Sequence, residues 1–269
     1  MSLSQYVFPV PNSKNASRSI LLWPLILVKS TRYVVPVVYT SEYPIFSVTA
    51  DIVALTIMDA ALCALVVERG GEPFRGREAL PGGFVEQSEG LYEAAVRELR
   101  EETAVSTGDL RLEQLATYGA PERDPRGRVV SVAWLAVLPS GPEPRGGSDA
   151  ASAAWKPVDQ LMRPGLLAFD HREILADGVE RARAKLEYTG LATEFVDPEF
   201  TVAELRQVYE VMWGRRLDPG NFHRKVTRTD GFVQRVGRAV RRGPGRPAEL
   251  FRFGGAEVLH PPLSRSTLG

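Results

Sequence analysis

One stretch of this sequence, GGFVEQSEGLYEAAVRELREETAV from Gly82 to Val105, limits what the chain can fold into more than any other. It contains six glutamates, and three of them stand close together at Glu98, Glu101 and Glu102. The residues before it, from Gly70 to Gly83, are rich in Gly and Pro, which is typical of a loop region. The apolar spacing that follows predicts a helix after this loop.

Projected at 100° per residue, the predicted helix has an apolar face between about 0° and 140°. Glu102 falls inside that face, near about 20°, Glu98 falls at its edge, near about 340°, and Glu101 lies farther round, near about 280°. A carboxylate buried without a partner costs several kcal/mol, so an ordinary solvated helix does not explain the pattern. The apolar face consists of Leu91, Tyr92, Ala95, Val96 and Leu99.

The three clustered glutamates also repel one another. Glu98 and Glu102 are an i,i+4 pair and Glu98 and Glu101 an i,i+3 pair, and each such pair costs a few tenths of a kcal/mol even in water. A positive partner is therefore needed. Clustered carboxylate oxygens are the ligands that Mg²⁺ or Mn²⁺ selects, usually with phosphate oxygens completing the shell.

The same stretch resembles the Nudix box, a pattern that fixes several polar and glycine positions over 23 residues. One position departs from the family, because Ala104 stands where Gly is expected. If Ala104 takes a left-handed conformation, the cost is on the order of 1 kcal/mol. The matching positions are Gly83, Glu89, Arg97, Glu98, Leu99, Glu101, Glu102 and Val105.

The resemblance implies an αβα sandwich with a loop-helix-loop that holds a divalent metal. It makes Glu98, Glu101 and Glu102 metal ligands or catalytic base, with Arg97 bracing the loop against Glu89. The implied reaction is hydrolysis of a nucleoside diphosphate linked to another group, in which metal neutralises the pyrophosphate and activates water.

The segments on either side, PFRGREALPGGFV and ATYGAPERDPRGRVVSVAWLAVL, look like the ADP-ribose-directed branch of that family. A guanidinium donates two parallel bonds to an oxyanion, which favours phosphate or ribose contacts for the arginines of the second segment. The alternative is a basic surface turn, although turn chemistry explains its Pro and Gly and not its arginines. The candidate ligand-binding residues are Arg75, Arg77, Gly82, Gly83, Phe84, Arg123, Arg126 and Arg128.

Two apolar runs precede the loop region, at 48–57 and 61–67, and predict a β-hairpin or neighbouring strands. The chain has 269 residues, of which 44% are hydrophobic, which suits one large domain or, as we favour, two smaller ones with separate cores. The single cysteine, Cys63, lies in an apolar run and indicates a reducing, cytoplasmic setting. The three histidines, His171, His223 and His260, lack the pairing that a structural zinc needs.

The N-terminal extension, residues 1–45, is expected to pack on the first domain or to be partly disordered. Its apolar run ILLWPLILV, Ile20 to Val28, is far shorter than the roughly twenty residues that cross a bilayer. No small-residue cleavage site follows it, which argues against a signal peptide. No membrane association is expected.

Charge is distributed unevenly along the chain. The net charge is zero, but Thr201 to Gly255 holds twelve Arg or Lys against five Asp or Glu, an excess of +7. The rest of the chain therefore carries −7. An acidic body joined to a basic C-terminal module points toward nucleic acid.

The basic module has the pattern of a helix-turn-helix. Thr201 and Glu204 form a capping box, Gly214 ends the first helix, and Asp218-Pro219 starts a second. The segments FVQRV and AELFRF read as strands around the loop RRGPGR, which resembles the wing of a winged helix. A basic domain that binds nothing is the alternative. The candidate DNA contacts are Asn221, His223, Arg224, Lys225, Arg228, Arg241, Arg242 and Arg246.

A helix from about Asp170 to Leu186, with Asp170 as a candidate cap, is expected to link the two parts. His171 is expected to be a packing or capping residue. The expected division is extension 1–45, αβα sandwich 46–165, linker helix 166–190, winged helix-turn-helix 191–255 and tail 256–269.

Over roughly Ser47 to Phe253, the order of domains is similar to the Nudix-related transcriptional regulators of NAD metabolism, the NrtR family. The resemblance implies a homodimeric repressor of NAD biosynthesis or salvage genes that senses ADP-ribose or a related NAD metabolite and then releases operator DNA. The rival hypothesis is a Mg²⁺-dependent ADP-ribose pyrophosphatase that yields AMP and ribose 5-phosphate. Because the metal-binding glutamates are retained, both the repressor and the pyrophosphatase hypotheses stay open.

Overall fold

The computed structural model describes residues 20–22, 37–39, 43–103, 111–139, 150–241 and 247–265. The chain divides into two units, Met1–Ile45 and Phe46–Gly269. In the first unit, β1 (Ile20–Leu22) pairs antiparallel with β2 (Val37–Tyr39). Apart from residues 43–45, which are exposed, the rest of the extension lies outside the described residues, and with it the expectation that it packs or is disordered.

The second unit begins with a mixed sheet whose order is β5-β4-β3-β8-β7, with β6 paired to β3 and β9 paired to β4. β3 and β8 run parallel from Ser47↔Val129 to Leu55↔Val137, and the other pairs are antiparallel. The strands are β3 (Ser47–Met58), β4 (Ala61–Arg69), β5 (Glu78–Ala79), β6 (Gly82–Phe84), β7 (Glu113–Tyr118), β8 (Val129–Val137) and β9 (Ala150–Pro157).

The predicted hairpin is confirmed by β3 and β4, which pair antiparallel up to Met58↔Ala61. The two residues between them, Asp59 and Ala60, have φ of 49° and 57°. A type I′ turn requires two successive left-handed residues. This turn is favoured between paired strands because its twist matches theirs.

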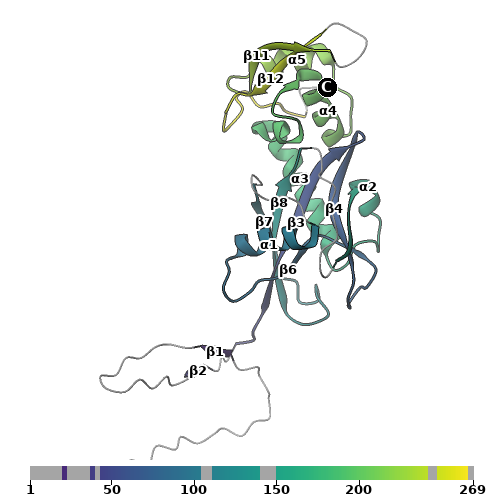
Figure 1. Ribbon diagram of the computed structural model, residues 1–269, viewed down its shortest axis with the longest axis vertical. Helices are drawn as coiled ribbons and strands as arrows, with labels where there is room; N and C mark the ends of the chain where they lie inside the picture. The colour runs from purple at the N-terminus through teal and green to yellow at the C-terminus, as the bar shows by residue number, and fades with distance from the viewer. Residues whose placement is uncertain are drawn as a thin grey trace, which may run out of the picture. The chain divides into compact units, whose positions relative to one another are not determined.

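A helix covers each face of this sheet (Figure 1). Ala50, Ile52 and Ala54 of β3 pack with α1 (Leu91–Thr103), while Val53 and Leu55 point to the opposite face, toward α3 (His171–Tyr188). Alternation along a strand sends successive side chains to opposite faces, so a strand buried on both reads as nearly continuous apolar sequence. The expected αβα sandwich is confirmed.

Two local expectations needed correction. The region from Gly70 to Gly83 is not all loop, since it contributes β5 and part of β6 to the sheet. The helix exposes Leu91 and Tyr92, which are 39% and 42% exposed, because both lie in its first turn. The buried positions follow one turn later, at Ala94, Ala95, Leu99 and Thr103.

The C-terminal part is a winged helix. Thr201 accepts a hydrogen bond from the Glu204 N–H and Glu204 accepts one from the Thr201 N–H, so the capping box is confirmed. Gly214 ends α4 with φ 65°, and Asp218 caps α5. The elements are η1 (Gly190–Phe195), β10 (Phe200–Thr201), α4 (Val202–Trp213), α5 (Pro219–Arg228), β11 (Val233–Val240) and β12 (Ala248–Phe253), with strand order β10-β12-β11.

The expectation of two separate cores is wrong. One cluster of buried side chains continues from Val53 and Leu55 of the sheet through Ile174 and Leu186 of α3 into the winged helix. The reason is that α3, followed along the chain, packs first on the sheet and then against η1 and α4.

The remaining elements complete the sandwich. α2 (Val158–Leu161) follows β9 directly, and β9 itself was not expected from its Ala- and Ser-rich sequence. Cys63 is buried in β4, as its apolar neighbours indicated. In the described ranges, no helix combines the length and the apolar character that a membrane span requires.

Candidate ligand pocket and nucleic-acid interface

Arg97 holds the loop before α1 against the helix. Its Nε donates to Glu89 Oε2 at 2.9 Å, and its Nη2 donates to Glu89 Oε1 at 2.6 Å and to the Phe84 carbonyl at 3.1 Å. The Glu86 N–H also donates to Glu89, at 2.9 Å. The bonds from Arg97 and from that N–H lower the pKa of Glu89 to about 2. The contact expected between Arg97 and Glu89 is therefore present.

Glu98 and Glu102 lie beside the two glycines of β6. The Gly82 N–H donates to Glu102 Oε2 at 2.9 Å. A Cβ on Gly83 would lie 2.3 Å from Glu98 Oε1, and a Cβ on Gly82 would lie 2.3 Å from the Ala50 carbonyl. Side chains at these positions would clash with the strand or with the carboxylate, so glycine lets the acids approach the backbone.

The protein destabilises the charged forms of these two acids. Burial raises the pKa of Glu102 to about 8, against the lowering effect of the Gly82 N–H. Burial also raises the pKa of Glu98, although Arg97 opposes the rise. Crowded, partly desolvated carboxylate oxygens are a donor set that a hard divalent cation would stabilise.

Glu101 is placed differently from the other two. Its side chain is 47% exposed and accepts from Arg97 Nη1 at 3.2 Å. It does not line the cavity that Glu98 and Glu102 share. Within the ranges that the structure describes, no group of three or more His, Cys, Asp or Glu is arranged to hold a metal ion. Two of the three expected ligands are thus brought together.

The cavity beside Glu98 and Glu102 has a volume of about 610 Å³. Its inner wall contains Asp51 of β3, which accepts a hydrogen bond from Ser131. Arg123 lies 3.6 Å from Asp51 and makes two hydrogen bonds to Asp170, at 2.8 and 2.7 Å. Burial lowers the pKa of Arg123, but its pairing with Asp170 and the charge of Asp51 outweigh this and raise it.

His171 completes this inner wall. Its Nδ1 accepts from the Leu80 N–H at 2.9 Å, and its Nε2 lies 3.9 Å from Asp51 Oδ1. Burial lowers the pKa of His171, which favours the neutral ring. His171 therefore packs as expected, and it also lines the cavity.

The outer wall alternates arginine and aromatic side chains. The guanidinium of Arg126 lies 4.8 Å from the ring centre of Phe84 and 5.4 Å from that of Phe169, and Arg69 lies 4.8 Å from Phe169. Asp124 accepts from Arg126, which lowers the pKa of Asp124 despite its burial. The cavity is therefore lined by both acids and arginines, which suits a diphosphate with a bound cation.

The expected ligand-binding residues divide into two groups. Gly82, Gly83 and Phe84, with Arg123 and Arg126, line the cavity. The others lie elsewhere: Arg75 is exposed, Arg77 lies over Phe74, and Arg128 lies over Phe46.

Several residues of the cavity wall were not among the sequence-based candidates, and those with charged or aromatic side chains include Asp51, Arg69, Phe169 and His171. The sequence did carry an indication for Asp51, since an acid within an apolar strand needs a polar or charged partner. The carboxylate of Asp170 was expected to cap α3, but it makes no capping bond and pairs with Arg123. Phe169 has φ 52°, a conformation that its sequence does not indicate.

The nucleic-acid candidates that the structure describes lie on α5 and at the end of β11. Phe222 and Val226 of α5 are buried, while His223, Arg224 and Arg228 are exposed. Arg224 donates to Asn221 at 2.7 Å. Lys225 is half-buried on the same helix. An apolar inner face with a basic outer face is what a recognition helix requires.

Arg241 is exposed at the end of β11, where the wing begins. Arg242 and Arg246 belong to the wing loop and lie outside the described residues, as does Ala104 after α1. Arg235 and Arg238 of β11 are engaged with Glu249 and Glu199.

Comparison with known families agrees with both parts of this architecture. Residues 47–178 match the NUDIX domain, and residues 192–253 match the NrtR DNA-binding winged helix domain. The chain is 33% identical over 215 residues to the ADPR responsive transcriptional repressor NtrR of Acinetobacter baylyi, covering 79% of this chain and 84% of the relative.

Two further relatives match different shares of the chain. The structure of Shewanella oneidensis NrtR complexed with a 27mer DNA superposes with a TM-score of 0.67 at 29% identity, covering 81% of this chain and 99% of that one. An ADP-ribose pyrophosphatase of Methanocaldococcus jannaschii is 42% identical over 113 residues, 42% of this chain and 63% of the relative. The match to the repressor extends through both domains, and the chain belongs to the NrtR family of Nudix-related transcriptional regulators.

Proposed function

We propose that this chain is a DNA-binding transcriptional repressor whose pocket senses ADP-ribose or a related NAD metabolite and whose operator is released when the effector binds. One observation carries the proposal: a diphosphate-type pocket and a basic winged helix occur in one chain that aligns along 79% of its length with an ADPR responsive repressor. The genes it controls are proposed to be those of NAD biosynthesis or salvage.

In this proposal Arg69 and Arg126 meet the anionic oxygens of the effector, because both line the cavity. Glu98 and Glu102 hold a divalent cation, Mg²⁺ or Mn²⁺, beside the diphosphate, and Arg97 with Glu89 fixes the loop that presents them. When bound, the cation supplies positive charge that offsets the diphosphate and the two acids.

The DNA contacts are assigned to the exposed side of α5 and to the wing. Arg224 and Arg228 enter the major groove, and Arg241 meets phosphate. A homodimer is proposed because helix-turn-helix proteins read two half-sites about 34–36 Å apart through their two-fold symmetry.

The proposal is tested by titrating the protein against a labelled duplex from the region upstream of its own gene, with and without ADP-ribose and Mg²⁺. The expected result is salt-sensitive, sequence-preferring binding that ADP-ribose weakens by about 5- to 150-fold. Binding that ignores DNA sequence, or that ADP-ribose leaves unchanged, would reject the repressor.

Two variants separate the two sites. Glu102→Gln is expected to weaken metal and effector binding while DNA affinity stays at the wild-type value. Arg224→Ala is expected to do the reverse, because it changes a residue on the exposed side of α5. If either variant impairs both activities and remains folded, the assignment of the sites is wrong.

A second candidate function is hydrolysis of ADP-ribose to AMP and ribose 5-phosphate. The proximity of Glu98 and Glu102 at the cavity and the 42% identity to an ADP-ribose pyrophosphatase favour it, while the exposed position of Glu101 argues against it. ADP-ribose incubated with protein and Mg²⁺ is analysed for AMP. Product formation that Glu102→Gln abolishes would establish the hydrolase, and the absence of AMP above the blank would exclude it.

A further inference from the structure

One helix, α3, connects the pocket to the winged helix. It packs on β3, β7 and β8 of the sandwich and also on η1 and α4 (Figure 1). At 18 residues, it is about 27 Å long at 1.5 Å per residue. A continuous helix of this kind moves as a rigid element, so a displacement of its beginning is transmitted to its end.

The beginning of α3 lies in the wall of the pocket. Asp170 occupies the N-cap position, yet its carboxylate makes no capping bond and instead accepts both hydrogen bonds from Arg123. The Arg123 side chain is 3% exposed, and Asp51 lies 3.6 Å away. Arg123 is therefore a single buried cation that ties the start of α3 to the sheet.

The end of α3 is hydrogen-bonded to the winged helix and to the segment that follows the winged helix in sequence. The hydroxyl of Tyr209 donates to the Leu186 carbonyl at 3.0 Å, and Arg183 donates to the Met212 carbonyl at 2.7 Å. The Leu259 N–H donates to the Tyr188 carbonyl at 2.8 Å. The bonds of Tyr209 and Met212, of which the first is buried, couple α4 to any movement of α3.

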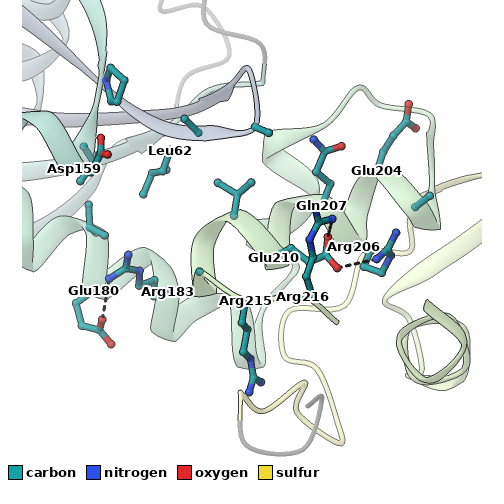
Figure 2. A pocket seen from close by; sticks show the side chains of 18 of the residues that line it. Leu62, Asp159, Glu180, Arg183, Glu204, Arg206, Gln207, Glu210, Arg215 and Arg216 are labelled. Atoms are coloured by element: carbon teal, nitrogen blue, oxygen red, sulfur yellow. Dashed lines mark hydrogen bonds and ion pairs between the residues drawn. The ribbon is translucent and has the colours of Figure 1, made fainter. Parts of the chain in front are cut away.

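A large cavity leaves room for such a movement. It has a volume of about 1510 Å³ and lies between the sandwich and α4. Leu62 of the β3–β4 hairpin and Gln207 of α4 both line it (Figure 2), as do Val158 of α2 and Ala203 of α4. The charged side chains on α4 are engaged nearby, as Arg206 bonds to Glu210 at 2.7 Å. The winged helix is thus held along α3 and also contacts strand β4 of the hairpin, and the cavity leaves open space beside that contact.

We propose that Arg123 and Asp170 form a switch: an anionic oxygen of the effector takes Arg123 from Asp170, and α3 then carries the winged helix across this cavity. This inference rests on the proposed function and names how its site is regulated. Two arrangements of Asp170 are chemically available. When its carboxylate is paired with Arg123, Asp170 holds α3 in the position described above. When the carboxylate is released from Arg123, it can cap α3, which is the role that Asp favours at this position.

The switch predicts opposite effects of Asp170→Asn on the two ligands. Asn caps a helix as well as Asp does but cannot pair with Arg123 as an anion. The variant should therefore resemble the effector-bound protein. Its DNA affinity without ADP-ribose should fall to the value that wild type shows with ADP-ribose, and by reciprocity its affinity for ADP-ribose should rise.

The test uses the full chain, a labelled upstream duplex, and ADP-ribose with Mg²⁺. DNA affinity is measured by fluorescence anisotropy and ADP-ribose affinity by calorimetry, and a thermal melt establishes folding. Asp177→Asn is the matched control, because it makes the same change on the exposed side of the same helix and its amide oxygen can still accept from the Tyr118 hydroxyl. It should keep wild-type values for both ligands. A variant damaged only in stability would lose affinity for both ligands together.

A second variant tests the movement without touching the pocket. Ala203→Trp fills the cavity from the exposed side of α4, so ADP-ribose should still bind while DNA affinity changes less than about 2-fold on its addition. Ala203→Ser, which leaves the space open, should respond like wild type. This pair decides the question if Asp170→Asn does not fold.

The outcomes are distinct. A wild-type response in Asp170→Asn, or in Ala203→Trp when Asp170→Asn does not fold, overturns the switch and leaves the repressor intact. A wild-type protein whose DNA affinity ADP-ribose does not change overturns the proposed function and the switch with it. Opposite shifts in Asp170→Asn, together with loss of response in Ala203→Trp, support the switch.

Discussion

At the scale of single residues, Arg123 shows the conditions under which a cation is tolerated inside this protein. Its charge is held by Asp170 at 2.7 Å and by Asp51 at 3.6 Å. Replacing it with an uncharged residue would leave two acids facing each other without compensation. Breaking a buried ion pair costs about 3–5 kcal/mol, and the lower end applies because Asp170 keeps 17% of its side chain exposed.

We therefore expect Arg123→Met to lower the free energy of unfolding by about 3 kcal/mol in urea denaturation. Arg163→Met, at an exposed position after α2, should change it by less than about 0.5 kcal/mol. Equal losses in the two variants would mean that the pairing with Asp170 and Asp51 contributes nothing.

His171 gives stability a dependence on pH. Burial lowers its pKa below the ordinary value of 6.5, so the folded state prefers the neutral ring. This contribution is fully present above pH 6.5 and is lost as the pH falls from 6.5 through the folded-state pKa, because the unfolded chain binds the proton first.

His171→Asn is the informative substitution, since the Asn carbonyl oxygen can accept from the Leu80 N–H in place of Nδ1 and does not titrate. Between pH 7.5 and pH 5.5, wild type should lose more thermal stability than this variant. Melting curves at both pH values measure the difference. Parallel losses would show that another group causes the acid sensitivity.

At the scale of elements, the packing of α3 on the sheet depends on Gly178. A Cβ there would lie 2.7 Å from Val53 Cγ1 of β3. Overpacking costs about 1–3 kcal/mol, whereas Ala is about 1 kcal/mol more favourable than Gly within a helix. We therefore expect Gly178→Ala to destabilise the protein by about 1 kcal/mol net.

A double-mutant cycle checks the cause of that loss. In a Val53→Ala background Cγ1 and Cγ2 are gone and only Cβ, at 3.0 Å, stays close, so Gly178→Ala should no longer destabilise the protein. Urea denaturation of the four proteins gives the coupling between the two positions. A coupling energy near zero would show that the helix and the strand do not meet there.

At the scale of the whole molecule, the continuous core predicts that the sandwich and the winged helix unfold together. Ile174 and Leu186 at the two ends of α3 belong to the same buried cluster, and both are fully buried. We expect one calorimetric transition whose van't Hoff and calorimetric enthalpies agree. Two resolved transitions would mean that the domains are independent and that α3 connects them only through its chain.

The sequence was most informative where local chemistry decides local structure. Helix α4 begins at the Thr201–Glu204 box and ends at Gly214, and α5 begins at Asp218. Each of these residues acts on the backbone hydrogen bonds of its own turn, so its effect can be read from the local sequence. The two apolar runs predicted their hairpin because strand pairing across a short turn is also a local event.

Contacts between distant segments could not be predicted in the same way. The position of Asp170 before its helix predicts a helix cap. The fold, however, brings Arg123, 47 residues earlier, to its carboxylate. The carboxylate then bonds to the charged guanidinium in place of a neutral backbone N–H, because hydrogen bonds between charged groups are stronger. Arg75 and Arg128 look equivalent to Arg126 in sequence, and only the path of the backbone separates them from the cavity.

By itself, therefore, the sequence determined the β3–β4 hairpin, the ends of the winged-helix helices and the position of Glu98 and Glu102 at the apolar face of their helix, since periodicity, caps and glycines act over a few residues. The αβα sandwich followed from the resemblance of the Nudix-box residues, and the structure separated Glu101 from the other two acids. The tertiary structure decided that the two domains share one core and that α3 connects the pocket with the winged helix. The physical reason is that burial and ion pairing depend on which side chains meet across the fold, and sequence spacing does not encode those encounters.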